Sequence, residues 1–62
     1  MADYRIGMRA ELHPATDAWM RGDRYGDIVL VSKDGQTFRI RMDRSGKTLT
    51  VSERNLARVF RA

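Results

Sequence analysis

The stretch Thr37-Phe38-Arg39-Ile40-Arg41-Met42 alternates apolar and polar side chains without a break. A period of two is typical of a β-strand with one buried face. We therefore expect Phe38, Ile40 and Met42 to face a core, while the intervening Arg39 and Arg41 face solvent. Asp34-Gly35, just before this stretch, is a strong signal for a tight hairpin turn. The segment 37–42 is thus predicted to be a strand that is entered through a hairpin.

Further strands are predicted on both sides of this segment. Upstream, Ile28 to Val31 is a continuous aliphatic run. Downstream, a turn at 43–46 leads to a strand from Thr48 to Ser52, with Leu49 and Val51 inward. Residues Ser52 to Leu56 resemble one helical turn capped by Ser52, and Ala57 to Phe60 follow as a short last strand.

The N-terminal part also alternates, from Arg5 to Leu12. This pattern predicts a first strand whose inward side chains are Ile6, Met8, Ala10 and Leu12. His13 to Tyr25 contains the only proline and a turn-rich end, so we expect one long structured loop. A connection of this length in a small domain is usually functional.

Composition limits what such a chain can be. With 62 residues it is expected to form one domain, 1–62, and to bury only about 60% of its unfolded surface. The sequence has no cysteine and one histidine, so neither a disulfide nor a zinc site is expected to support the core. No signal peptide or membrane-spanning run is present, and we expect a complete, cytoplasmic chain that binds no membrane.

The predicted order is strand, long loop, three strands joined by turns, one helical turn and a last strand. From about Arg5 to Phe60 this order resembles the SH3-like barrel, whose 3₁₀ turn before the final strand would correspond to 52–56 here. The resemblance implies an all-β fold, a five-stranded SH3-like barrel with one 3₁₀ turn before the last strand. Closure would also hide the edges of short amphipathic strands.

Within that fold no family is assigned. The segment Gly22 to Val29 is similar to the glycine-rich entry into a strand of KOW and related barrels, a group that includes Tudor-like and accessory-subunit types. There, Gly22 and Gly26 are expected to supply positive φ angles. The aromatic motifs of proline-binding SH3 domains are absent. The plasmid-encoded dihydrofolate reductases share the architecture, but 49–52 lacks their glutamine and tyrosine, so neither activity is transferred.

Catalysis is not expected. His13 is the sole imidazole, while Ser45 reads as a turn residue and Ser52 as a cap, and no acidic residue has a recognisable spacing to His13. We therefore predict no catalytic residues, no metal ligands and no cofactor.

The long loop holds the most distinctive side chains. An aromatic residue interleaved with arginines can grip a peptide or stack on bases. The predicted partner-binding residues are Trp19, Met20, Arg21, Arg24 and Tyr25. The alternative is that Trp19 and Met20 fold inward to plug an open end of the barrel and that Tyr25 packs beside the second strand.

A second candidate surface is basic. The net charge is +4, and Lys33 and Lys47 are the only lysines among the cationic residues. The residues predicted to contact a phosphate backbone are Arg9, Arg39, Arg41, Arg44 and Lys47. The alternative is a solvated face on which arginines pair with Glu11, Asp27 or Asp43.

Two functions follow from these surfaces. The first is a non-catalytic accessory or adaptor module that binds a protein partner, favoured because the net charge is modest. The alternative is a small barrel that binds RNA or DNA through the arginine-rich strand face. Self-association into a homo-oligomer is compatible with both, through an exposed Val29 or Val31.

Overall fold

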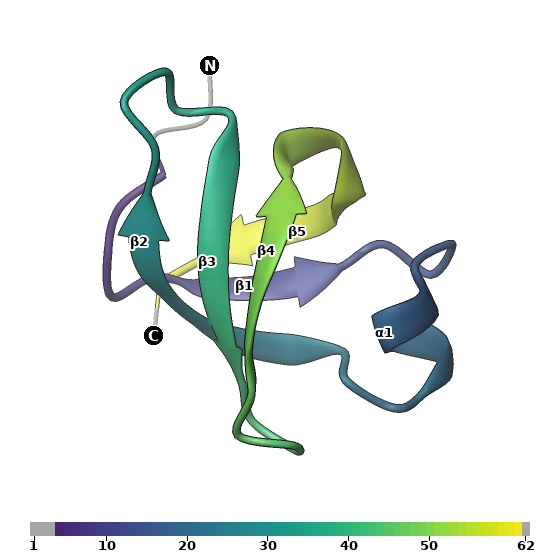
Figure 1. The fold of residues 1–62 in the computed structure, drawn as a ribbon. Helices are drawn as coiled ribbons and strands as arrows, with labels where there is room; N and C mark the ends of the chain where they lie inside the picture. Colours follow the sequence, from purple (N-terminus) through teal and green to yellow (C-terminus); the bar gives the residue numbers. More distant parts are fainter. Residues whose placement is uncertain (1–3, 62) are drawn as a thin grey trace.

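The computed structural model describes residues 4–61, which form five strands, one short helix and one 3₁₀ turn (Figure 1). In chain order the elements are β1 (Arg9–Leu12), α1 (Asp17–Met20), β2 (Tyr25–Val31), β3 (Thr37–Met42), β4 (Thr48–Ser52), η1 (Glu53–Asn55) and β5 (Leu56–Phe60). The strands form one antiparallel sheet in the order β4-β3-β2-β1-β5. The predicted five strands and the 3₁₀ turn before the last strand are confirmed.

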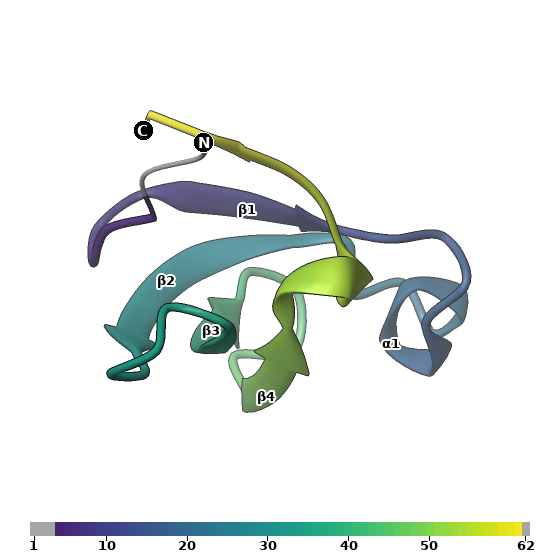
Figure 2. The same ribbon diagram turned by 90° about the horizontal axis from the view of Figure 1, so that it is seen from above.

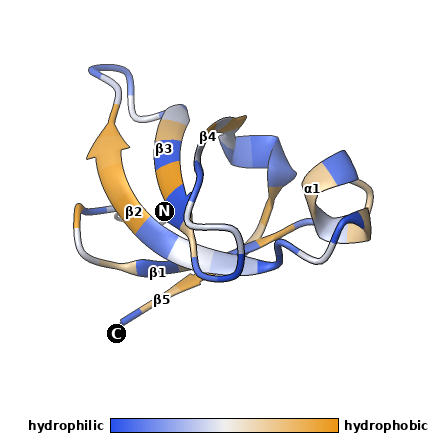
Figure 3. Cartoon of the chain, turned by 60° about the horizontal axis from the view of Figure 1, so that its bottom comes forward, coloured by the Kyte–Doolittle hydropathy of each residue, from blue (hydrophilic) through white to orange (hydrophobic). Residues whose placement is uncertain are grey.

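The pattern over 37–42 is confirmed residue by residue. Phe38, Ile40 and Met42 are fully buried, whereas Arg39 and Arg41 are exposed. Figure 3 shows this alternation as hydrophobic and hydrophilic bands along β3. Since side chains of successive strand residues point to opposite faces, β3 contributes three side chains to the core and two arginines to the outer surface.

The sheet folds over its own interior because β2 bends between its two neighbours, β1 and β3. Its first residues, Tyr25 to Asp27, pair with β1, while Gly26 to Val31 pair with β3. The register with β3 shifts between Ile28 and Leu30, which indicates a β-bulge, and bulges bend a strand. Figures 1 and 2 show the result: β1 and β5 cross over β3 and β4.

The core is small. Its buried apolar members are Ala10, Leu12, Ala18, Ile28, Phe38, Ile40 and Met42. Leu49, Val51 and Val31 are partly buried against it, so the expected exposure applies to Val29, which is 39% exposed, but not to Val31.

The sheet is not closed into a barrel. β4 and β5 are its two edges, and each has one hydrogen-bonded neighbour. The expected closure is therefore not shown, although the strand order and the position of η1 agree with the prediction. Small shifts accompany this agreement: β5 begins at Leu56 instead of Ala57, and Ser52 makes no side-chain cap bond to η1.

The first strand is shorter than predicted. Ile6 and Gly7 form a turn instead of a strand, and Ile6 is 65% exposed instead of buried. Gly7 has a φ of 95°, and its N–H donates to the carbonyl of Ile28 at 2.9 Å. The alternation of the sequence continues through this turn, but a left-handed glycine ends the strand geometry on which the alternation depends.

The segment 13–25 is not wholly a loop, because it contains α1. Thr16 caps this helix, its hydroxyl accepting from the N–H of Trp19 at 3.3 Å. Gly22, with a φ of 101°, ends it: the N–H of Gly22 donates to Trp19 and that of Asp23 to the carbonyl of Ala18. These two bonds form a Schellman motif. Threonine followed by aspartate, with glycine after one turn, was a helix signal that the loop prediction missed.

Gly26 does not have the expected positive φ. It is buried in β2, and a Cβ placed there would lie 2.5 Å from the carbonyl oxygen of Arg41 and 2.7 Å from Cγ2 of Ile40. A glycine is needed here because β2 and β3 approach closely, which is a packing reason and not a conformational one.

Candidate binding surfaces

The first surface is built on α1 and the loop that follows it. Met20 is 74% exposed and Arg21 is also exposed. Trp19 is half-buried, with part of its ring against the core, and the guanidinium of Arg24 lies 4.6 Å from its ring centroid. The alternative of inward folding therefore holds in part for Trp19 but is wrong for Met20. The cation–π contact fixes one arginine against the one indole of the chain.

Arg44 belongs to this surface instead of the strand face. Its guanidinium covers Gly22, since a Cβ on Gly22 would come within 2.0 Å of Nη1 of Arg44. The turn after β3 thus brings its arginine to the end of α1. We call Trp19, Met20, Arg21, Arg24 and Arg44 the α1 surface.

Tyr25, the fifth residue of the predicted partner-binding set, begins β2. It is 39% exposed and is the register partner of Glu11, which in turn pairs with Arg58 on β5. Arg58 and Glu11 also form an ion pair of 3.2 Å. The tyrosine is therefore the first residue of β2 and lies on the outer face of the sheet, where it is exposed and not packed as the alternative expected.

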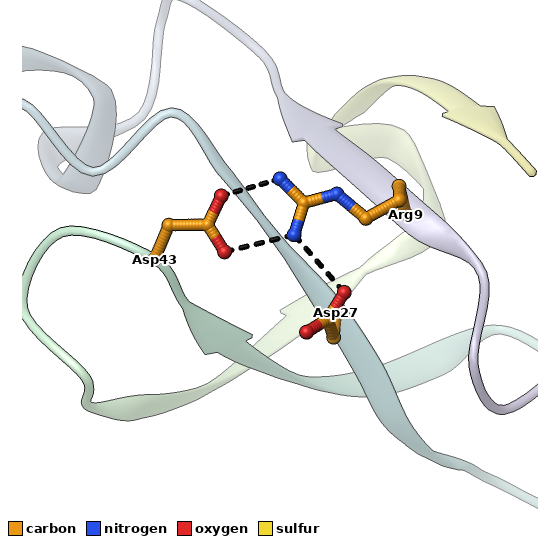
Figure 4. Close-up of polar contacts among 3 residues, drawn as sticks. All are labelled: Arg9, Asp27 and Asp43. Carbon is orange, nitrogen blue, oxygen red and sulfur yellow. Dashed lines mark hydrogen bonds and ion pairs between the residues drawn. The ribbon is translucent and has the colours of Figure 1, made fainter. Parts of the chain in front are cut away.

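Arg9 is the centre of an ion-pair cluster and not a free phosphate contact (Figure 4). Its Nη1 donates to Oδ1 of Asp43 at 2.8 Å and to Oδ1 of Asp27 at 3.0 Å, while Nη2 donates to the other oxygen of Asp43. For this arginine the alternative of internal pairing is confirmed. The cluster joins β1, β2 and the end of β3, three segments distant in sequence.

The electrostatics of the cluster agree with its geometry. The hydrogen bonds from Arg9 hold the pKa of Asp43 below its ordinary value, and the two carboxylates raise the pKa of Arg9. The carboxylate side chains are about half exposed, at 48% for Asp43 and 51% for Asp27, so water screens the pairs. A bidentate arginine of this kind serves mainly to fix the relative positions of the strands.

Arg39 and Arg41 remain as a basic row on the outer face. They are register partners of Thr50 and Thr48 on β4, and both are exposed. Within residues 4–61 neither forms an ion pair or a side-chain hydrogen bond. Lys47 is exposed in the adjacent turn. Of the five predicted phosphate contacts, Arg39 and Arg41 are exposed on β3 and Lys47 is exposed in the turn after it, whereas Arg9 is paired with carboxylates and Arg44 covers Gly22.

The residues considered for catalysis have local structural roles. Nδ1 of His13 accepts from the N–H of Ala15 at 3.1 Å, and Oγ of Ser45 accepts from the N–H of Lys47 at 3.2 Å. No hydrogen bond joins His13 to a serine hydroxyl in the part of the chain that the structure describes. Over the same residues no three histidine or acidic side chains gather into a metal-binding group.

None of the helices in 4–61 has the length and apolar character needed to cross a membrane. Comparison of the chain with protein-family models, with curated proteins and with solved structures found no match. The functional proposals below rest on the geometry of the two surfaces.

Proposed function

We propose that this chain is a small SH3-like barrel that acts as a non-catalytic protein-binding module, an accessory or adaptor unit whose contact region is the α1 surface. The SH3-like assignment is supported by the strand order β4-β3-β2-β1-β5 and by η1 between β4 and β5. The binding role is supported by one observation above all, the exposure of Met20 beside a fixed Trp19–Arg24 pair.

The physical argument concerns what these side chains contribute to folding. Met20 is 74% exposed, so it adds little to the core of a chain that has few apolar residues to spare. Tryptophan, methionine and arginine are enriched in protein interfaces, where a flexible thioether adapts to the partner and a rigid indole supplies area. Helix caps on both sides of α1 hold the indole in place before any partner arrives, which lowers the entropic cost of binding.

The test uses the double variant Met20→Ser/Arg24→Gln, because both positions are exposed and neither is a core residue. Affinity capture followed by mass spectrometry should recover a defined partner with the unmodified chain and lose it with this variant. The matched control is Lys33→Ser, an exposed basic residue in the turn between β2 and β3. Equal recovery by all three proteins would show that the α1 surface is not the contact region.

Nucleic acid is the second candidate, favoured by Arg39 and Arg41, which are exposed and form no ion pair within residues 4–61. Binding through three or four phosphate contacts would fall with salt with a log–log slope of about −3 on duplex DNA. Titration of a mixed oligonucleotide at several salt concentrations measures this slope. Binding that is absent at low salt excludes the candidate.

Self-association is compatible with either function. Ile6, Val29 and Leu30 are exposed apolar side chains, at 65%, 39% and 47%. Sedimentation at several protein concentrations shows whether copies associate.

A further inference from the structure

The outer edge of β4 is an open hydrogen-bonding surface. The N–H of Met42 donates to Lys47 and that of Glu53 to Gln36, each at 2.8 Å. Hydrogen-bonded and non-bonded pairs alternate along an antiparallel ladder, so the pairs between these two, Ile40↔Leu49 and Phe38↔Val51, are also bonded. The N–H and C=O groups of Thr48 and Thr50 must then point away from β3.

No other element of residues 4–61 satisfies these groups. β4 is the last strand of the sheet, and Thr48 and Thr50 are both exposed. Within residues 4–61, no hydrogen bond from another segment reaches either residue. The edge therefore offers two donors and two acceptors in the spacing of a β-strand.

β4 also lacks the usual protection of an edge strand. Natural edges are blunted by charged side chains, proline or bulges. Thr48–Ser52 contains no charge and no proline, and its register with β3 is regular. The other edge, β5, carries Arg58 and pairs with β1 through a shifted register at Glu11/Leu12. Of the two edges, β4 is the one suited to accept an added strand.

Two exposed arginines of β3 stand beside this edge, and on their far side Asp27 of β2 is the register partner of Arg41. Arg39 and Arg41 stand directly opposite Thr50 and Thr48 on the outer face. Threonine is short, and an added strand would lie about 10 Å from β3, two strand spacings away. Long guanidinium side chains can extend over the threonines toward such a strand. Carboxylates on the same face of the added strand would meet them.

A small hollow adjoins the same face. It has a volume of about 190 Å³ and is mainly apolar, and its lining residues are Leu30, Ser32, Thr37, Phe38, Arg39 and Thr50. Sites for drug-sized ligands occupy roughly 300–1,000 Å³, so this hollow suits a single apolar side chain. Leu30, 47% exposed, supplies an apolar wall.

We propose that the free edge of β4 binds an extended acidic segment of a partner protein as a sixth strand. Its backbone would bond to Thr48 and Thr50, its alternate carboxylates would face Arg39 and Arg41, and one apolar side chain would enter the hollow. This surface is separate from the α1 surface, and either can fail without the other. It goes beyond the proposed function by naming the chemical class of a partner and the strand that receives it.

Two other occupants fit less well. A second copy of the chain, pairing through its own β4, brings threonines to this face and no carboxylates. A phosphate backbone supplies acceptors for the arginines, but it does not reproduce the alternating donors and acceptors that Thr48 and Thr50 present. An acidic peptide satisfies both the backbone groups and the charges.

The test is an NMR titration with a short acetylated peptide in which glutamate alternates with leucine and valine. Amide shifts should concentrate in 48–52 and spare α1. The matched peptide with glutamine for glutamate, and the double variant Arg39→Gln/Arg41→Gln, should each weaken binding at least about tenfold. Two further peptides carry N-methyl groups on alternate residues, offset by one residue from each other. The peptide whose methyl groups replace the N–H groups that bond to β4 should not bind, and the other should bind normally.

The variant Thr50→Pro tests the edge from the protein side. It removes an outward N–H without removing a bond to β3, as proline on an edge strand can. If the variant shows the dispersed amide spectrum of a folded protein but no longer binds the peptide, the proposal is supported. If the variant does not fold, the methylated peptides test the same hydrogen bonds on the unmodified chain. The proposal is overturned if the acidic peptide causes no shifts, if an oligonucleotide alone shifts 48–52, or if those shifts arise from protein concentration without peptide.

Discussion

Substitution of Gly26 by alanine tests the close approach of β2 to β3. The added Cβ would lie 2.5 Å from the carbonyl oxygen of Arg41 and 2.7 Å from Cγ2 of Ile40. Ordinary carbon–oxygen contacts fall at about 3.3–3.6 Å, so β2 and β3 must separate locally by almost 1 Å. Because the obstructing oxygen belongs to the backbone, no rotamer change relieves the contact.

The expected cost combines two terms. Overpacking of this kind costs about 1–3 kcal/mol, and the stretched ladder loses roughly one hydrogen bond, worth about 1 kcal/mol. We expect the free energy of unfolding to fall by about 3 kcal/mol. A domain of this size has a total stability of roughly 3–9 kcal/mol, so the variant should be partly unfolded or melt at least about 12 °C lower.

Urea unfolding followed by the fluorescence of Trp19, the one tryptophan of the chain, measures this loss. The control is Gly35→Ala, where φ is 72° and nothing lies within 4 Å of the added Cβ. It carries backbone strain without a clash and should cost about 1 kcal/mol. If Gly26→Ala is no less stable than Gly35→Ala, the close approach of β2 and β3 is wrong.

Three further predictions concern single side chains. The pKa of Asp43 is lowered in the folded state, so the carboxylate stabilises the fold above its ordinary pKa near 4, and this stabilisation is lost as the pH falls below that value. Asp43→Asn should therefore lower the free energy of unfolding at neutral pH by less than about 1 kcal/mol and flatten the acid limb of a stability–pH curve. An unchanged acid limb would contradict the pairing with Arg9. Met42→Ala should cost about 2–5 kcal/mol in urea unfolding, while Met20→Ala stays within about 0.5 kcal/mol, since the two are 1% and 74% exposed; similar costs would mean that burial is misassigned. Thr16→Ala removes the cap of α1 and should cost about 1 kcal/mol in the same assay, and Thr16→Ser should restore most of it.

The elements around β3 were predictable because their signals are local. Apolar residues alternate with polar ones in 37–42, and only in a strand does this period of two place all the apolar side chains on one face. The alternation therefore identified both the buried residues of β3 and the exposed Arg39 and Arg41. The same applies to β4 and to the 3₁₀ turn at 53–55. The caps of α1 at Thr16 and Gly22 are local signals too, but threonine, aspartate and glycine are also common in turns, so the segment was predicted to be a loop.

The candidate surfaces were predictable only in part. Met20 is exposed and Trp19 contacts Arg24, and the sequence could bring these residues together because all three lie close along the chain. The basic set was divided, because the partners of Arg9 are 18 and 34 residues away and Arg44 turns toward Gly22. No local pattern reveals which carboxylate or turn an arginine will meet.

By itself the sequence determined where β3 and β4 form and which of their faces is buried, because hydrophobic burial acts on a periodicity that each of these segments carries. Tertiary structure alone decided that Gly26 is required by a neighbouring carbonyl, that the sheet stays open, and that Thr48 and Thr50 direct their backbone groups outward. These properties depend on which strands become neighbours and in what register. That choice is made by contacts between segments distant in the chain, so it has no signature in any one of them.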